Sequence, residues 1–336
     1  MKNFNRLYFI VVLFILFSVS LKAQHIIQVQ QGKPTSIRGL SVVNDHVAWI
    51  SGSKGYIAIT SDGGKTWIWQ QVKGFEKADF RDIEAFSDKE AVIMSSGTPA
   101  LVLKTIDGGL NWQVKYRNTD TAYFLDAMDF DKPKHGVILG DPINNKFLLL
   151  ETNDGGETWN PINDQPYAIP SEAAFAASGT CLLVIDGSLF IVSGGNTARL
   201  LTYTPNGSWN YLNLPITHGK ASQGAFSIAE YKKQLVVVGG DYQKDQSRDS
   251  TACYSLDKGL TWQSADSFPI GFQSSVEFIS GDTFLSTGTP GSNISIDGGK
   301  NWTKIDDTSY NVCRKAKHGK LVLLAGNGGK IGLFEL

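Results

Sequence analysis

One eight-residue phrase occurs five times in this chain of 336 residues and constrains its fold more than any other feature. The phrase has the pattern S/T-x-D-x-G-x-x-W, and its copies are Thr60–Trp67, Thr105–Trp112, Thr152–Trp159, Ser255–Trp262 and Ser295–Trp302. An Asp with Gly close behind it allows a tight chain reversal, because the carboxylate accepts backbone N–H groups and Gly adopts positive φ. The flanking residues alternate between apolar and polar, so each phrase predicts a β-hairpin. We call these five segments the box turns.

The Trp that ends each box turn predicts a wedge between neighbouring sheets, because a ring of that size dominates local burial. A degenerate sixth copy of the phrase, Thr204–Trp209, lacks two residues and has Asn206 in place of the Asp. The phrase is identified as the Asp-box, or BNR repeat, and is similar to that of sialidases and of the photosystem II stability/assembly factor family. The resemblance implies a β-propeller in which the box aspartates shape turns and are neither catalytic nor calcium ligands. These are Asp62, Asp107, Asp154, Asp257 and Asp297.

The spacing of the repeats predicts the number of propeller blades. The box positions lie 40 to 52 residues apart, which is the period of a four-stranded blade. A second element, a turn of small residues before each box, occurs seven times. It is found at 51–53, 96–98, 140–142, 193–195, 239–241, 287–289 and 325–327. We therefore predict an all-β fold, a single seven-bladed β-propeller over residues 24–336.

The last blade has only three strands at the C-terminal end of the sequence. Residues His25 to Gln30 form an alternating apolar segment ahead of the first blade. We predict that this segment supplies the missing outer strand, which ties the two ends together and removes two sheet edges that could pair with other chains.

Residues 1–23 read as a signal peptide, because Lys2 and Arg6 precede an apolar run from Leu7 to Phe17. Cleavage is expected near Ala23 and Gln24, with an uncleaved signal anchor as the alternative. A periplasmic or secreted protein is therefore expected. The mature chain contains no apolar stretch of the roughly 20 residues that cross a bilayer.

Composition narrows the classes of partner. Once the three basic residues of the signal are removed, 28 Lys and Arg face 32 Asp and Glu, a net charge of −4, which argues against nucleic acid as a ligand. Three cysteines do not make a disulfide framework, so the core must supply the stability; 42% of the residues are hydrophobic. The five histidines show no metal-site spacing, and no phosphate-binding loop is present. We expect a monomer without metal or cofactor.

The fold predicts where a ligand could bind, because the innermost strands of all blades begin at one mouth of the central channel. Alignment of these strands places an inner strand of blade four at 171–174. The polar residues brought to the mouth are Arg38, Arg81, Asp126, Glu172, Gln273 and Asn311, with Asp141, Asp241 and Tyr242 reaching in from turns. Arginine forks and carboxylates around one cavity suit an acidic or polyhydroxyl ligand. The alternative is that they pair with each other along a water-filled channel. The charged loop Tyr242–Thr251 is expected to be solvated.

Two functions of different classes follow. The seven blades resemble the photosystem II assembly factor family, which implies an exported binding or assembly factor for a protein or an oligosaccharide. The alternative is a glycan-acting enzyme, a hydrolase or lyase, in which Arg38 and Arg81 hold an acidic sugar. Its acid and base would be two of Asp126, Asp141, Glu172 and Asp241. A sialidase is disfavoured, because Ile37-Arg38-Gly39 departs from the sialidase Arg-Ile-Pro motif and sialidases have six blades.

Overall fold

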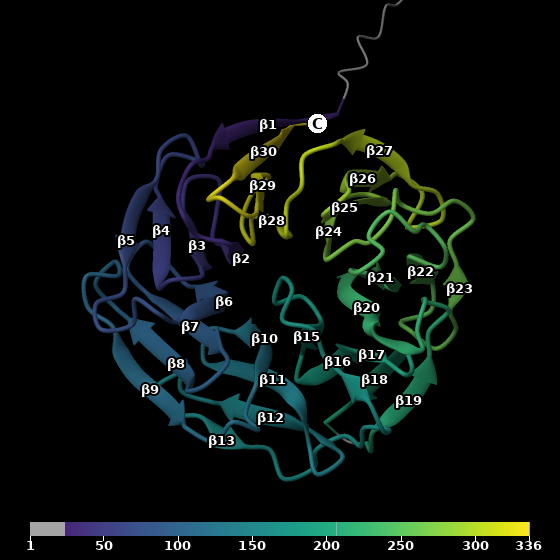
Figure 1. The fold of residues 1–336 in the computed structure, drawn as a ribbon, viewed down its shortest axis with the longest axis horizontal. Helices are drawn as coiled ribbons and strands as arrows, with labels where there is room; N and C mark the ends of the chain where they lie inside the picture. Colours follow the sequence, from purple (N-terminus) through teal and green to yellow (C-terminus); the bar gives the residue numbers. More distant parts are fainter. Residues whose placement is uncertain (1–23, 206, 336) are drawn as a thin grey trace, which may run out of the picture.

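The computed structural model describes residues 24–205 and 207–335, and these residues form strands and turns without any helix. Seven antiparallel sheets stand around a central axis like the blades of a propeller (Figure 1), so the predicted fold class and blade count are confirmed. The predicted signal peptide and the Asn206 of the degenerate box copy lie outside the described residues.

The first three blades each have four strands that run in chain order from the axis to the rim. Blade one contains β2 (Ile37–Val42), β3 (Ala48–Gly52), β4 (Tyr56–Thr60) and β5 (Ile68–Gln71). Blade two contains β6 (Asp79–Ala85), β7 (Ala91–Ser96), β8 (Ala100–Thr105) and β9 (Gln113–Asn118). Blade three contains β10 (Leu125–Lys132), β11 (His135–Ile143), β12 (Lys146–Thr152) and β13 (Asn160–Pro161).

Blades four to six have the same four-stranded arrangement, and the sheet of blade five has two additional short strands. Blade four contains β15 (Leu182–Ile185), β16 (Ser188–Val192), β18 (Arg199–Tyr203) and β19 (Asn210–Asn213). Blade five contains β20 (Lys220–Tyr231), β21 (Gln234–Asp241), β22 (Ala252–Ser255) and β23 (Gln263–Ser264), and the short strands β14 (Glu172–Ala173) and β17 (Gly194–Gly195) extend its sheet. Blade six contains β24 (Ser275–Ser280), β25 (Thr283–Gly288), β26 (Gly291–Ser295) and β27 (Thr303–Asp306).

The seventh blade is closed by the N-terminal strand, as predicted. Strands β28 (Val312–Lys315), β29 (Val322–Ala325) and β30 (Ile331–Glu335) come from the end of the chain, and β1 (His25–Gln30) pairs antiparallel with β30. Figure 1 shows β1 on the rim beside β30. The register places Ile26 opposite Phe334. The two ends of the chain therefore share one sheet.

The predicted inner strand of blade four is wrong. Residues 171–174 do not line the axis as a blade strand; Glu172 and Ala173 pair only with Gly195 and Gly194. The inner strand is β15, which begins at Leu182. The alignment failed because the eight residues between Ala173 and Leu182 form an insertion, and these residues take the axial position themselves.

The box turns share one hydrogen-bond pattern. In the first, the Thr60 hydroxyl donates to Asp62 over 2.8 Å and accepts the Gly64 amide, while the Thr66 amide donates to Asp62 over 2.9 Å. The other four turns repeat these three contacts. The Thr66 hydroxyl also donates to Asp62 over 2.6 Å, and this contact leads those that lower the pKa of Asp62 to about 2. The box carboxylates are thus occupied within their own turns.

The core consists of apolar clusters at the contacts between blades, and the box tryptophans lie in them. Trp112 of blade two meets Trp49 of blade one edge to face, with ring centroids 6.3 Å apart. Trp159 and Trp302 pack against blades two and five in the same way. The prediction that each Trp is a wedge between sheets is confirmed. The three cysteines are buried and free.

Candidate functional site

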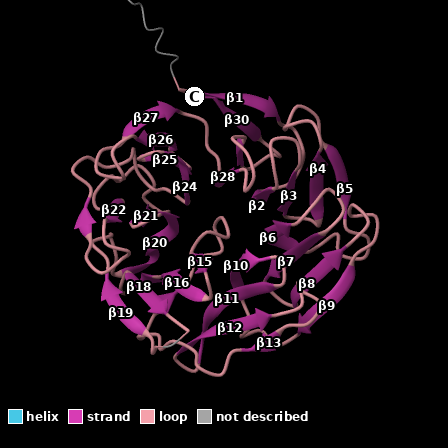
Figure 2. Ribbon diagram, turned by 180° about the vertical axis from the view of Figure 1, so that it is seen from behind, coloured by secondary structure: helices cyan, strands magenta, loops and turns pink. Residues whose placement is uncertain are grey.

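The central channel is closed by a segment that we call the plug, residues 174–181, between β14 and β15. Both views of the fold show a loop at the axis beside β15 (Figures 1 and 2). Three blades reach it with arginines: the carbonyls of Ala177, Ala176 and Gly179 accept from Arg38 over 3.2 Å, from Arg81 over 3.4 Å and from Arg314 over 3.5 Å. From blade six, the Ser274 carbonyl accepts the Ser178 hydroxyl over 2.7 Å. The plug is therefore held from several blades at once.

A buried carboxylate lies against the plug. Asp82 accepts the amides of Ile83 and Met128 over 2.8 and 2.7 Å. Burial raises its pKa well above the usual range. A Cβ on Gly179, whose φ is +68°, would collide with this carboxylate, so the plug needs glycine there to approach so closely. The plug separates the channel into two cavities, one at each face of the disc.

The first cavity, which we call the channel-mouth cavity, has a volume of about 440 Å³. It opens on the face where the inner strands begin. An aromatic cup forms much of its wall: the ring of Phe175 stacks on Phe226 at 3.8 Å, and Phe272 and Tyr242 meet Phe226 edge to face. Tyr242 is 49% exposed, so it stands at the rim. The cup can hold an apolar side chain.

Two arginines flank this cup. Arg38 and Arg81 both line the cavity, and Arg81 also donates to Asp79 over 2.8 Å and lies over the ring of Phe124. Burial, and then the neighbouring Arg81, lower the pKa of Arg38 from its ordinary value. Each guanidinium has five N–H donors, and the plug and Asp79 use only some of them. The remaining donors can bind a carboxylate of a ligand.

Asp126 also borders the channel-mouth cavity. Its side chain is fully buried, and the Ala176 amide lies near it, but neither carboxylate oxygen makes a hydrogen bond of normal geometry. Burial, followed by the charge of Asp141, raises the pKa of Asp126 well above its usual value, with Arg81 acting in the opposite direction.

The structure brings five of the sequence-predicted site residues to this cavity. These are Arg38, Arg81, Asp126, Tyr242 and Asn311. The other four are not in its lining. Gln273 is fully buried, and its amide oxygen accepts from Ser286 and Asn293. Asp241 accepts from the Gln243 amide and from the Gln223 side chain.

The remaining two carboxylates have partners of their own. Asp141 accepts the amide of Ala174 over 3.2 Å, and burial raises its pKa to about 6. Glu172 makes a forked ion pair with Arg199, in which Nε donates over 2.8 Å and Nη2 over 2.5 Å. The Ser193 hydroxyl donates to the same carboxylate over 2.5 Å. Glu172 therefore anchors the start of the plug to blade four.

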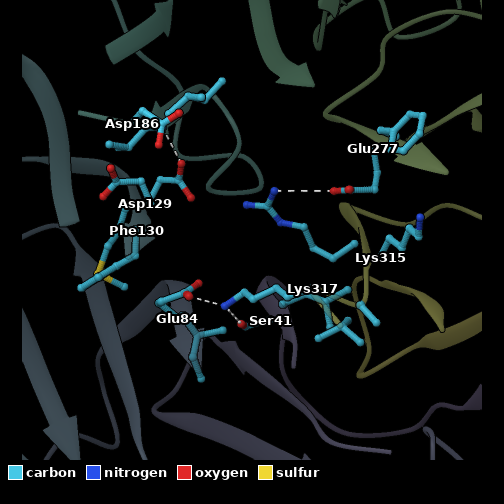
Figure 3. Close-up of a pocket in the computed structure, with 18 residues that line it drawn as sticks. Ser41, Glu84, Asp129, Phe130, Asp186, Glu277, Lys315 and Lys317 are labelled. Atoms are coloured by element: carbon cyan, nitrogen blue, oxygen red, sulfur yellow. Dashed lines mark hydrogen bonds and ion pairs between the residues drawn. The ribbon is translucent and has the colours of Figure 1, made fainter. Parts of the chain in front are cut away.

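The second cavity, which we call the box-face cavity, has a volume of about 550 Å³ and opens on the opposite face. Figure 3 shows its charged side chains: Asp129 and Asp186 on one side, Glu277 and Lys315 on the other, and Lys317 beside Glu84 and Ser41. Each cation in this lining already has a partner. Arg314 lies 3.7 Å from Glu277, Lys317 pairs with Glu84, and Lys315 donates to the carbonyl of Ile279 over 2.5 Å.

Burial is the main cause of the raised pKa values of two acidic side chains in the box-face cavity. It raises the pKa of Asp129 to about 6 and that of Glu277 to about 7, and Arg314 opposes both shifts. Asp129 keeps one strong contact, because it accepts the Val184 amide over 2.6 Å. Within the described parts of the chain, no group of three or more His, Cys, Asp or Glu side chains could hold a metal ion.

Sequence reasoning missed the aromatic cup and the plug. Phe124 and Phe272 line the cavity, and in the sequence they come just ahead of the aligned polar positions, so the alignment could have indicated these two aromatic residues. Phe175 and Phe226 come from the insertion and from the unaligned inner strand of blade five. Arg314 and Glu277 of the box-face cavity carried no signal, because nothing in a single sequence shows which strand residues face the axis at its far end.

The comparisons with known proteins agree with this architecture. Residues 21–119 match the family model described as photosynthesis system II assembly factor YCF48. A curated relative from Synechococcus sp. (strain CC9902), the photosystem II assembly lipoprotein Ycf48, is 32% identical over 116 residues. That match covers 33% of this chain and 32% of the relative, so the alignment spans about a third of each protein.

Solved structures of the same fold cover nearly the whole chain. YCF48 from Cyanidioschyzon merolae has a TM-score of 0.66 at 18% identity and covers 93% of this chain and 99% of its own. A structure of YCF48 bound to D1 peptide has a TM-score of 0.64 at 14% identity and covers 95% and 96%. At these identities the likeness establishes the fold. The chain is a seven-bladed β-propeller that resembles the photosystem II assembly factor YCF48, with the sequence match lying in the N-terminal strand and the first two blades.

Proposed function

We propose that this protein is a non-catalytic binding and assembly factor for a polypeptide partner, and that the channel-mouth cavity holds a segment of that partner. The observation that carries the proposal is an aromatic cup flanked by two arginines in front of a closed channel. A site of this kind can bind a chain without letting it pass through.

Each wall of the cavity contributes a different interaction. The cup of Phe175, Phe226 and Phe272 takes an apolar or aromatic side chain of the partner, which gains from area burial and from edge-to-face contacts. The free donors of Arg38 and Arg81 bind a carboxylate beside that side chain, either a chain end or an acidic residue. Tyr242 at the rim adds an amphipathic contact.

The arrangement of carboxylates does not favour the glycan-acting enzyme. Glycoside hydrolysis needs two carboxyl groups on opposite sides of one substrate cavity. Of the four candidates only Asp126 borders the channel-mouth cavity; Asp141, Glu172 and Asp241 bond to other protein groups. An acidic oligosaccharide held by the same arginines is therefore included below only as a comparison ligand.

The resemblance to YCF48 supports a protein as the ligand, since one relative is bound to D1 peptide. The predicted signal over residues 1–23 supports export to the periplasm or beyond, with a mature chain that starts near Gln24. We also propose that this mature chain acts as a monomer. Among the residues that the structure describes, no helix is long and apolar enough to span a membrane.

The proposal is tested by titrating the mature protein, residues 24–336, with the peptide N-acetyl-Ala-Ala-Phe and following the aromatic-cup resonances by NMR. We expect saturable binding that weakens at least tenfold in Arg38→Ala/Arg81→Ala. Arg117→Ala, on the exposed outer strand of blade two, is the matched control and should bind normally. Thermal melts check that each variant is folded.

Three outcomes separate the possibilities. Binding that is lost only in the double variant supports a peptide site at the channel mouth. Peptide binding that survives in a folded double variant overturns it. A response to acidic oligosaccharides such as oligogalacturonate, without a response to the peptide, would assign the same arginines to a glycan instead.

A further inference from the structure

The burial of the Asp126 side chain costs folding free energy that its contacts in the structure do not offset. Its side chain is fully buried, and neither carboxylate oxygen makes a hydrogen bond of normal geometry; the Ala176 amide lies near enough only to lower its pKa against the effect of burial. A buried polar group without a partner loses its bonds to water and gains nothing in exchange, so such groups are rare in folded proteins. The other buried carboxylates along the channel are not in this position. Asp82 accepts two amides, and Glu172 accepts a guanidinium and a hydroxyl.

The surroundings of Asp126 determine its protonation. Asp141 on β11 adds negative charge beside it, and Arg81 on β6 adds positive charge. The Cys181 thiol is also near: burial raises its pKa, and the charge of Asp126 adds to that rise. Burial dominates, so the pKa of Asp126 stands well above its usual range. A neutral carboxyl has one O–H donor and one carbonyl acceptor side by side.

That pair of groups has a specific complement. An amide offers an N–H donor and a C=O acceptor, and the two can form a matched pair of hydrogen bonds with a neutral carboxyl. Carboxylates offer only acceptors, and an apolar side chain offers neither. A peptide ligand carries amides wherever it lies, and the carboxyl borders the same cavity that holds the arginines and the aromatic cup.

We propose that Asp126 is a specificity-determining residue of the channel-mouth cavity, whose buried carboxyl pairs with an amide group of the bound polypeptide. This inference rests on the proposed function. Because the cavity wall covers the carboxyl in the free protein, this pairing requires the side chain to turn toward the ligand when the partner binds. The structure of the free protein therefore holds an unsatisfied group whose bonds are completed by the partner.

Two substitutions separate this role from a structural one. Asp126→Asn keeps a donor and an acceptor at the same place without an ionisable proton. Asp126→Leu keeps the branching at Cγ, with methyl groups that are larger than the carboxyl oxygens, and removes both the donor and the acceptor. If the carboxyl serves only the fold, both variants should alter stability and neither should alter specificity. If it serves the ligand, Asp126→Leu should fold at least as well as the wild type, because it removes an unsatisfied buried group.

The experiment compares two probes by NMR titration at pH 5.5, 7 and 8.5. N-acetyl-Ala-Ala-Phe carries an aromatic ring, a carboxylate and amides; 3-phenylpropanoate carries the ring and the carboxylate alone. We expect Asp126→Leu to weaken the peptide about tenfold or more and to leave 3-phenylpropanoate unchanged. Asp126→Asn should bind the peptide like the wild type. The wild-type affinity should fall as pH ionises Asp126, while Asp126→Asn, which keeps Asp141, provides the baseline.

The result distinguishes the two proposals. If the peptide binds and needs Arg38 and Arg81, but folded Asp126→Leu binds it as tightly as the wild type, the role of Asp126 is overturned and the proposed function stands. Equal weakening of both probes would also overturn it, since that would report a distorted cavity. If neither probe binds at all, the proposed function fails with it.

Discussion

The ring of Phe175 lies parallel to the ring of Phe226, with centroids 3.8 Å apart and planes 7° apart. Phe175 belongs to the plug and Phe226 to the inner strand of blade five, so one stacked pair both closes the channel and forms the base of the aromatic cup. The stability of the plug and the shape of the cavity are therefore coupled.

Replacing Phe175 with Ala should show this coupling. The change removes a half-buried ring and its stacking, which we expect to lower the free energy of unfolding by about 1 to 3 kcal/mol. It should also weaken the binding of N-acetyl-Ala-Ala-Phe. Urea unfolding and NMR titration measure the two effects, and Phe175→Leu, which keeps an apolar side chain, should recover more stability than binding. An unchanged unfolding midpoint in Phe175→Ala would contradict the structure of the plug.

The ion pair between Glu172 and Arg199 predicts that replacing Glu172 alone destabilises the protein more than replacing both residues. Glu172→Ala leaves Arg199 without its partner in a position where the side chain is only 11% exposed, and breaking such a pair costs about 3 to 5 kcal/mol. The double variant Glu172→Ala/Arg199→Met removes the unpaired charge and should recover much of the loss. Chemical denaturation of the wild type, Glu172→Ala, Arg199→Met and the double variant tests this, and additive effects of the two substitutions would be the contrary result.

Deletion of the N-terminal strand should destabilise the closed ring. A protein starting at residue 32 lacks β1, leaves β30 as an open edge and exposes the contacts of Ile26 and Val29. We expect the melting temperature to fall by about 5 to 10 °C and aggregation to increase. Differential scanning calorimetry compares it with the protein starting at residue 24. Equal melting temperatures would show that the three C-terminal strands of blade seven suffice.

The buried acids of the box-face cavity predict how stability depends on pH. Asp129 and Glu277 have pKa values of about 6 and 7 in the fold, against 3.8 and 4.5 as ordinary values. The folded protein thus holds these protons more tightly than the unfolded chain does. Between about pH 4 and 7 the contribution of both groups to stability falls as pH rises, and it is flat above that range.

Urea unfolding at pH 5, 6, 7 and 8 measures this slope. The variant Asp129→Asn/Glu277→Gln should show a smaller loss of stability from pH 5 to pH 8 than the wild type. The pKa of His135 is raised by Asp131 and Glu151 against the effect of burial, so it contributes a slope of the same sign. His135 is present in both proteins and cancels in the comparison. Parallel pH profiles for the two proteins would refute the prediction.

The local repeats alone determined the blade count, the box turns and the closure by β1. The box turns and the blade period depend on residues close together in the chain, whereas β1 and β30 come from its two ends. An Asp that bonds within its own turn, a Gly with positive φ and a Trp at a set distance act at short range. The N-terminal strand could be assigned because an alternating segment was left over while the last blade lacked a strand.

The binding site was only partly predictable, for a physical reason. Alignment by blade found Arg38, Arg81, Asp126 and Asn311, because strand starts are repeated positions. The plug breaks the repeat, and a segment without a counterpart in the other blades gives no position to align. Only packing in three dimensions decided that residues 174–181 enter the axis, that Glu172 pairs with Arg199 and that Asp126 stays buried without a hydrogen bond of normal geometry. These contacts join residues far apart in the chain, and their energies depend on burial, which the repeated motifs do not report.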